Sequence, residues 1–222
     1  MADQVQIQTM NLDHEEPMAG IMPSVLTAMS YLLQRVSESN DKLSQKKQRI
    51  SGFHGLTKPS ISIRSYLERI FEYANCSYSC YIVAYIYLDR LVKKQPFLPI
   101  NSHNVHRLII TSVLVSAKFM DDLSYNNGYY AKVGGISREE MNMLELDFLF
   151  GIEFQLNVTV STFNNYCGFL QNEMVMLMKM ESLFLKPSLS FRGSFKTKLL
   201  MNPHEEDSLS THHNKKQQLA AA

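Results

Sequence analysis

Residues 101–122 are the segment that most restricts how this chain can fold. Apolar side chains recur in it at spacings that cover every face of a 3.6-residue helix. These residues are Val105, Leu108, Ile109, Ile110, Val113, Leu114, Val115, Ala117 and Phe119. A helix that is apolar on all sides is buried on all sides, because an exposed face would leave hydrocarbon in water. With Asn101 and Ser102 as a start signal after Pro99, the segment predicts a central helix with other helices packed around it.

Five further segments carry apolar residues at helical spacing. They cover residues 23–36, 60–75, 80–94, 137–151 and 159–185. The fourth begins with a capping box, in which the Ser137 oxygen accepts from the amide of Glu140 and the Glu140 side chain reaches back. Residues 123–135 are polar and rich in glycine and asparagine, and we expect a turn there, part of it a short helical turn. The predicted fold class is all-α.

The composition divides the chain into four parts. Residues 1–22 are polar and without a period, and we expect a disordered arm. Residues 23–58 hold an N-terminal helix and a linker, and residues 59–186 hold a compact run of five helices. Residues 187–222 are again polar, so a disordered tail is predicted.

The charge and hydropathy of the chain exclude several classes of partner. The net charge is +1 at pH 7, so neither nucleic acid nor an acidic membrane surface is expected as a partner. No apolar run approaches the roughly 20 residues that a membrane-spanning helix needs. Residues 1–8 are polar, unlike a secretory signal. With three cysteines, an odd number, we expect an intracellular protein with free thiols.

Candidate catalytic and metal-binding residues are few. Cys76 and Cys80 could seat a metal ion, but no second ligand pair has zinc-site spacing, so two thiols packed as small apolar groups are favoured. His103 and His106 could share a helix face, and we interpret them as surface residues. Glycine-rich phosphate loops and nucleophile elbows do not occur in the sequence. We therefore expect no catalysis, no bound metal and no cofactor.

Four ionisable residues inside the apolar segments offer two pairs of opposite charge. They are Arg64, Asp89, Lys118 and Glu145. A charge in such surroundings needs a partner, because unpaired burial costs several kcal/mol or more. For Arg64 and Asp89 an internal salt bridge between consecutive helices is favoured. Lys118 could instead be satisfied by the aspartates at 121 and 122, so Lys118 and Glu145 could together clamp the backbone of a partner helix.

Five stretches, in this order and with this spacing, resemble a cyclin box. They read S-I-R-S-Y-L-E-R-I (62–70), V-A-Y-I-Y-L-D-R-L (83–91), V-H-R-L-I-I-T-S-V-L-V-S-A-K-F-M-D-D (105–122), Y-N-N-G-Y-Y-A-K-V-G-G-I (125–136) and L-E-L-D-F-L-F-G-I-E-F-Q-L (144–156). Within that family, residues 23–172 are most similar to the P-type cyclins of plants, also called U-type, which are relatives of the phosphate-signalling cyclins of yeast. The resemblance implies a single five-helix cyclin box in residues 59–186, preceded by an N-terminal helix.

The resemblance also implies a function. Cyclins of this kind are regulatory subunits that bind and activate a cyclin-dependent kinase, here one of the A-type or of the phosphate-signalling kind. The expected process is cell division or nutrient- and phosphate-linked signalling, in the nucleus, the cytoplasm or both.

The residue roles of the family carry over onto the two charge pairs. Arg64 and Asp89 match the internal pair that joins the first two box helices. Lys118 and Glu145 match the pair that grips the regulatory helix of the kinase. The residues expected on the kinase-contact face are Lys118, Phe119, Glu145 and Phe148.

The chain departs from mitotic cyclins in one respect. Mitotic cyclins carry Met-Arg-Ala-Ile-Leu and a nearby tryptophan as a substrate-docking patch, whereas residues 63–67 read I-R-S-Y-L and the chain has no tryptophan. Docking through that patch is not expected.

Two other functions stay open. The alternatives are a cyclin-fold transcription factor, which the near-neutral charge disfavours, and a helical scaffold for a partner that is not a kinase.

Overall fold

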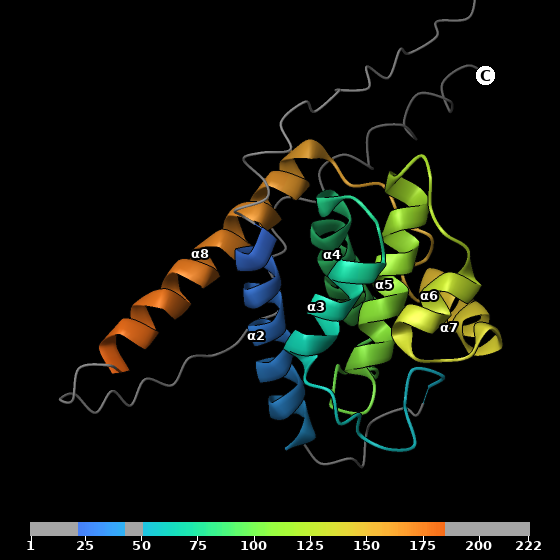
Figure 1. Ribbon diagram of the computed structural model, residues 1–222, viewed down its shortest axis with the longest axis horizontal. Helices are drawn as coiled ribbons and strands as arrows, with labels where there is room; N and C mark the ends of the chain where they lie inside the picture. The colour runs from blue at the N-terminus through green and yellow to red at the C-terminus, as the bar shows by residue number, and fades with distance from the viewer. Residues whose placement is uncertain (1–21, 43–50, 185–222) are drawn as a thin grey trace, which may run out of the picture.

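The computed structural model describes residues 22–42 and 51–184, and over these residues the chain is a bundle of helices without a strand. The helices are α2 (Met22–Asp41), α3 (Ile63–Tyr73), α4 (Tyr78–Lys94), α5 (Val105–Met120), α6 (Asn127–Gly134), α7 (Arg138–Gly151) and α8 (Val160–Phe184). Residues 1–21, 43–50 and 185–222 lie outside the described part, and with them most of the predicted arm, part of the linker and the predicted tail. Figure 1 shows the arrangement, which confirms the predicted all-α class.

Helix α5 lies at the centre of the bundle, as predicted. Its residues from Val105 to Ala117 are buried except for Arg107. Helices α3, α4, α6 and α7 all pack against it, and Figure 1 shows them around it. The helix begins at Val105 rather than at residue 101 or 102, because the preceding residues close a turn. In that turn the amide of Asn101 donates to Oδ1 of Asn104 at 2.8 Å.

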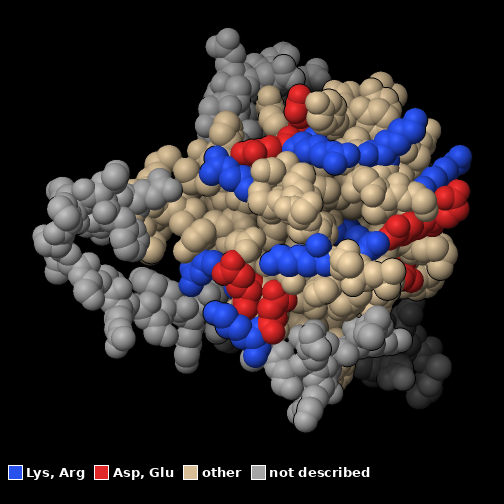
Figure 2. Space-filling view, turned by 60° about the horizontal axis from the view of Figure 1, so that its bottom comes forward, with Lys and Arg blue, Asp and Glu red and all other residues tan. Residues whose placement is uncertain are grey.

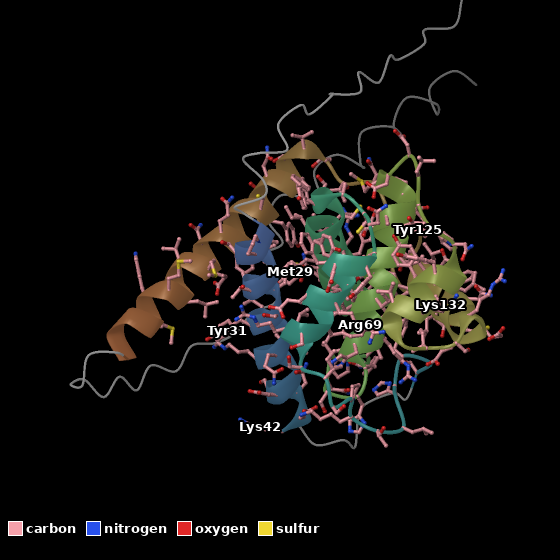
Figure 3. The ribbon with its side chains drawn as sticks, in the orientation of Figure 1. Met29, Tyr31, Lys42, Arg69, Tyr125 and Lys132 are labelled. Carbon is pink, nitrogen blue, oxygen red and sulfur yellow. The ribbon has the colours of Figure 1, made fainter. Side chains whose placement is uncertain are left out.

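Residues 127–134 form a complete helix, α6, where the sequence indicates only a short helical turn. The side-chain oxygen of Asn126 caps this helix by accepting from the amide of Tyr129 at 3.1 Å. Gly135 ends it with a φ of 71°, a left-handed conformation that glycine adopts without steric cost. Arg69 of α3 donates to the carbonyl of Lys132 at 3.1 Å and so ties α6 to α3 (Figure 3).

Helix α7 begins at the predicted cap, but the capping box does not close. Ser137 Oγ accepts from the amide of Glu140 at 3.0 Å. The Glu140 carboxylate does not reach back; it bonds Arg107 of α5, whose Nε and Nη2 each lie 2.6 Å from Oε1. This carboxylate therefore holds the first turn of α7 against the central helix.

Helix α8 runs across α2 and α4 on one side of the bundle (Figure 1). Helix α2 contributes a buried apolar stripe, made of Val25, Leu26, Ala28, Met29, Leu32 and Leu33. Tyr166 of α8 is buried, and its hydroxyl donates to Oδ2 of Asp89 in α4. Nζ of Lys93, one turn further along α4, lies 3.2 Å from the same oxygen. Asp89 thus connects α4 with α8.

The predicted salt bridge between Arg64 and Asp89 is wrong. The Arg64 side chain is 63% exposed, and its Nε pairs with Oε1 of Glu68 at 2.9 Å. Asp89 is fully buried and bonds Tyr166 and Lys93. The reason is geometric: a partner one turn away on the same helix is always within reach, whereas a partner on another helix is reached only if both side chains face the shared contact. Arg64 lies outside the inward stripe of α3.

Tyr166→Phe is expected to lower the free energy of unfolding by about 1.5–3 kcal/mol, the range for a hydrogen bond to a charged group. The phenyl ring keeps the packing and removes only the hydroxyl that faces Asp89. Arg64→Ala removes an exposed ion pair and should cost less than about 1 kcal/mol. Denaturant melts of both variants beside the parent chain measure the difference. If Arg64→Ala proved the more damaging change, the placement of these two residues would be contradicted.

His106 is buried in α5, although the sequence suggested a surface position. Its Nε2 lies 3.0 Å from the carbonyl oxygen of Ile61, and its ring meets that of Tyr66 edge-on with 4.9 Å between centroids. Burial lowers the pKa of His106, while the hydrogen bond with Ile61 acts in the opposite direction. His54 shifts the same way, because burial also lowers its pKa.

Stability is therefore expected to fall as the solution becomes mildly acidic. A histidine whose pKa is lowered by folding binds its proton more readily in the unfolded chain, so its contribution is complete above about pH 6.5 and is lost as pH falls below that value. Unfolding by denaturant at about pH 7.5 and about pH 5.5 measures the loss. His106→Gln should reduce this pH dependence, and an unaltered dependence in that variant would show that His106 does not cause it.

Candidate functional site

Lys118 and Glu145, predicted as a pair, meet across helices α5 and α7. Lys118 stands in the last turn of α5, and its Nζ lies 2.6 Å from Oε1 of Glu145. The two side chains are 35% and 16% exposed, so the pair lies at the rim of the bundle. An ion pair in such a position contributes about 1 kcal/mol or less to folding. Its contribution to folding stability is therefore a weak explanation for the presence of the pair.

Asp121, one of the two aspartates that the sequence offered as partners for Lys118, is engaged elsewhere. Its Oδ2 accepts from the amide of Ser77 at 3.0 Å and from the thiol of Cys80 at 3.3 Å. Both donors belong to the start of α4, so the carboxylate ties the end of α5 to that helix. Lys118 pairs with Glu145, and the structure brings together the pair that the resemblance implied.

Asn127 of α6 completes the site and was not predicted. Its Nδ2 donates to Oε2 of Glu145 at 2.6 Å and lies 2.9 Å from Oδ1 of Asn142. Glu145 is therefore held through both oxygens, one by α5 and one by α6. The sequence feature that could have indicated this role is the run Asn126-Asn127-Gly128. Asn126 caps α6, so the side chain of Asn127 is available to point toward α7.

Exposed apolar side chains follow each member of the ion pair along its own helix. Phe119 is 49% exposed and Met120 is 42% exposed at the end of α5, while Leu146 and Phe150 of α7 are 50% and 65% exposed. Large apolar groups exposed on the two helices that carry a charge pair are typical of a protein-binding surface rather than of a solvated face. We name this set the α5–α7 surface, and its members are Lys118, Phe119, Met120, Glu145, Leu146 and Phe150.

Phe148 does not belong to this surface, so its predicted contact role is wrong. Its side chain is fully buried, and its ring meets that of Phe53 edge-on at 6.2 Å between centroids. Phe148 lies three positions after Glu145 on α7. This spacing places it on the inner face of the helix, where Met141 and Leu144 are also buried. Phe119, predicted for the same face, is exposed as a contact residue must be.

Few other features of the described residues point to a function. Over residues 22–42 and 51–184, no three histidine, cysteine or acidic side chains are placed to hold a metal ion. Within the same ranges, no helix has the length and hydropathy needed to cross a membrane. Figure 2 shows basic and acidic side chains interspersed on one face rather than gathered into a field of one sign. Such a face offers no continuous track for a nucleic-acid backbone.

Comparison with known protein families and proteins gives a consistent result. Residues 15–156 match the family model described as Cyclin. Cyclin-U4-3 of Arabidopsis thaliana is 85% identical over 222 residues, which cover all of both chains. Cyclin-U4-2 of Arabidopsis thaliana is 67% identical over 205 residues, 91% of this chain and 94% of that protein. Cyclin-P4-1 of Oryza sativa subsp. japonica is 57% identical over 165 residues, 72% of this chain and 78% of that protein.

The family match includes helices α2 to α7 up to residue 156, and with them the Lys118–Glu145 pair. It ends before α8, which begins at Val160. The matched part is more than half of the chain, and the relatives carry U-type and P-type names. The chain therefore belongs to the cyclin family, in its plant U-type or P-type group.

Proposed function

We propose that this chain binds a cyclin-dependent protein kinase and activates it as a regulatory subunit, without catalysis of its own. The observation that carries the proposal is the Lys118–Glu145 pair, held 2.6 Å apart at the rim between α5 and α7, on helices that also expose large apolar side chains. The end of a helix presents backbone amides or carbonyls that lack an intrahelical partner. A glutamate can accept from such amides, and a lysine can donate to such carbonyls.

The pair is prepared for such a contact before any partner arrives. Glu145 is held by Lys118 and by Asn127, so little side-chain freedom remains to be lost on binding. The Lys118 ammonium has three donors, and one is used on Glu145. The others can reach carbonyl groups of a docked helix, while Phe119, Leu146 and Phe150 bury apolar area around them.

Activation would follow from selective binding to one conformation of the kinase. Phosphoryl transfer needs the strand lysine of the kinase paired with the glutamate of its regulatory helix. A partner that binds only the conformation with that pair formed shifts the population toward it. A preference of about 100-fold corresponds to about 2.7 kcal/mol, which a few buried contacts can supply.

The finer parts of the proposal rest on the resemblance to P-type cyclins. The kinase would be of the A-type or of the phosphate-signalling kind, and the process would be cell division or nutrient-linked signalling. The chain would act in the nucleus, the cytoplasm or both. Substrate docking on α3 is not part of the proposal, since Ile63, Tyr66 and Leu67 are all buried.

Affinity purification of the full chain from plant cells tests the proposal. We expect a cyclin-dependent kinase to dominate the recovered proteins and the recovered material to phosphorylate a protein substrate. Lys118→Ala with Glu145→Ala serves as the matched control and should lose the kinase. Recovery of DNA-associated proteins, or of a scaffold partner without kinase activity, would contradict the proposal and favour one of the alternatives.

A further inference from the structure

An asparagine followed directly by glycine occurs once in the chain, at Asn127 and Gly128. In such a pair the backbone nitrogen of the glycine can attack the side-chain carbonyl carbon of the asparagine, because glycine has no Cβ to block the approach. Asn127 is the first residue of α6 and Gly128 the second. The first amides of a helix have no intrahelical acceptor, and among the described residues the Gly128 amide donates to none. The attacking nitrogen is therefore available.

The surroundings of Gly128 favour the attack. A surface hollow of about 470 Å³ lies beside this residue, and Lys132 and Arg138 are among the residues that line it. Cδ of Arg138 is 3.5 Å from the position that a Cβ on Gly128 would take. The attack requires the Gly128 amide to lose its proton. The two cations and the positive end of the α6 dipole both favour that loss, and the hollow admits water.

We propose that Asn127 is a deamidation site, and that its conversion to aspartate or isoaspartate weakens kinase binding. The first part concerns this chain alone, and the second rests on the proposed function. Asn127 is half-buried, and its Nδ2 donates to Oε2 of Glu145 at 2.6 Å. A carboxylate at position 127 has no hydrogen to donate. It would replace this hydrogen bond by a second negative charge beside Glu145.

The reaction balances with water as the only co-reactant. The Gly128 nitrogen attacks Cγ of Asn127, so a C–N bond forms and a five-membered imide closes. The bond from Cγ to Nδ2 breaks, and Nδ2 takes up the proton lost by the Gly128 amide and leaves as ammonia. Water then adds to one of the two imide carbonyl carbons and breaks its bond to the Gly128 nitrogen, which regains a proton. Opening at Cγ gives aspartate, and opening at the backbone carbonyl carbon gives isoaspartate.

Ring closure requires the Asn127 side chain to leave Glu145 and Asn142, its two acceptors. The position in the fold makes this possible, because Asn127 begins a helix of only eight residues and the first residues of a helix fray. A docked kinase would hold Glu145 in place and slow the reaction. We therefore expect deamidation in the chain without bound kinase, and about tenfold weaker kinase binding afterwards.

Peptide mapping of the full chain tests the modification site without any kinase. The folded chain is kept in mildly alkaline buffer for increasing times and digested with trypsin, which yields the peptide Phe119–Lys132. We expect fragment masses to show a carboxyl in place of the amide at Asn127, and an isoaspartate methyltransferase to label part of the product. Asn142, inside α7 and followed by methionine, is the internal control and should keep its amide.

Two variants make the outcome decisive. Gly128→Ala adds a Cβ that would lie 3.2 Å from Oδ1 of Asn126; it should keep kinase affinity and slow the conversion. Asn127→Asp reproduces one product and should fold normally, as a thermal melt shows, but bind the kinase about tenfold more weakly. If Asn127 converted no faster than Asn142, or equally fast in Gly128→Ala, the site would be overturned.

The kinase affinity of the fresh, unmodified chain tests the proposed function separately from the modification site. If the fresh chain binds the kinase and Asn127→Asp binds it equally tightly, the coupling is overturned and the proposed function stands. If the fresh chain does not bind a kinase, the proposed function fails, and with it the coupling. The peptide map decides the deamidation site in either case, because it requires no kinase.

Discussion

Replacing Lys118 and Glu145 together by alanine is expected to weaken kinase binding at least about 100-fold while the chain still folds. Each side chain is proposed to make a charge-assisted contact worth about 1.5–3 kcal/mol. Two such losses exceed the roughly 2.7 kcal/mol that 100-fold represents. The fold should persist, because the change removes two opposite charges and leaves no lone buried ion, and the pair lost lies at the rim.

The measurement is a binding titration against a cyclin-dependent kinase, beside a thermal melt of the same preparation. Arg64→Ala with Glu68→Ala is a matched control, because it removes an ion pair of similar length from the exposed side of α3. That control should keep both its midpoint and its affinity. Retained binding in the Lys118 and Glu145 variant would disprove the interface. Loss of its fold would assign the two residues a structural role instead.

Phe148→Ala is expected to lower the free energy of unfolding by about 3–5 kcal/mol, the range for truncating a buried phenylalanine. The ring is fully buried and packs edge-on against Phe53, which lies before α3. Its loss would leave a cavity between α7 and that segment, and the contacts of Phe53 with it would be lost too. Chemical denaturation of the variant measures the effect.

Phe119→Ala is the natural comparison, because the two phenylalanines were predicted for the same contact face. Phe119 is 49% exposed, so its truncation should change the unfolding midpoint little and reduce kinase affinity. The expected pattern is therefore opposite for the two residues: stability lost at Phe148, and binding lost at Phe119. A Phe148→Ala chain as stable as the parent would contradict the burial of that ring.

The long helices were predictable because their apolar patterns are strong. Residues 105–117 carry hydrocarbon on every face, and no packing other than a central one could bury them. Helix α6 was underestimated, since its eight residues hold only three buried side chains and its stability depends on tertiary ties to α3 and α7. A segment that short has little helical signal of its own.

The candidate site was predictable in part, and the failures share a physical cause. Sequence order shows which residues are charged but not how two helices are rotated about their axes. Arg64 therefore appeared paired with Asp89, which in fact bonds Tyr166 and Lys93. Helix α7 has apolar residues on two faces, such as buried Phe148 and exposed Leu146, so its pattern could not select the outer one.

The most direct test of kinase regulation is the rate at which a purified plant cyclin-dependent kinase of the A-type phosphorylates a protein substrate, without and with this chain. We expect the rate to rise and saturate as the chain is added. The Lys118 and Glu145 double variant should need at least about 100-fold more protein for the same rate. A rate that stays at the level of the kinase alone, at chain concentrations where the two proteins are shown to bind, would contradict activation. Absence of binding to kinases of both the A-type and the phosphate-signalling kind would contradict the proposed function itself.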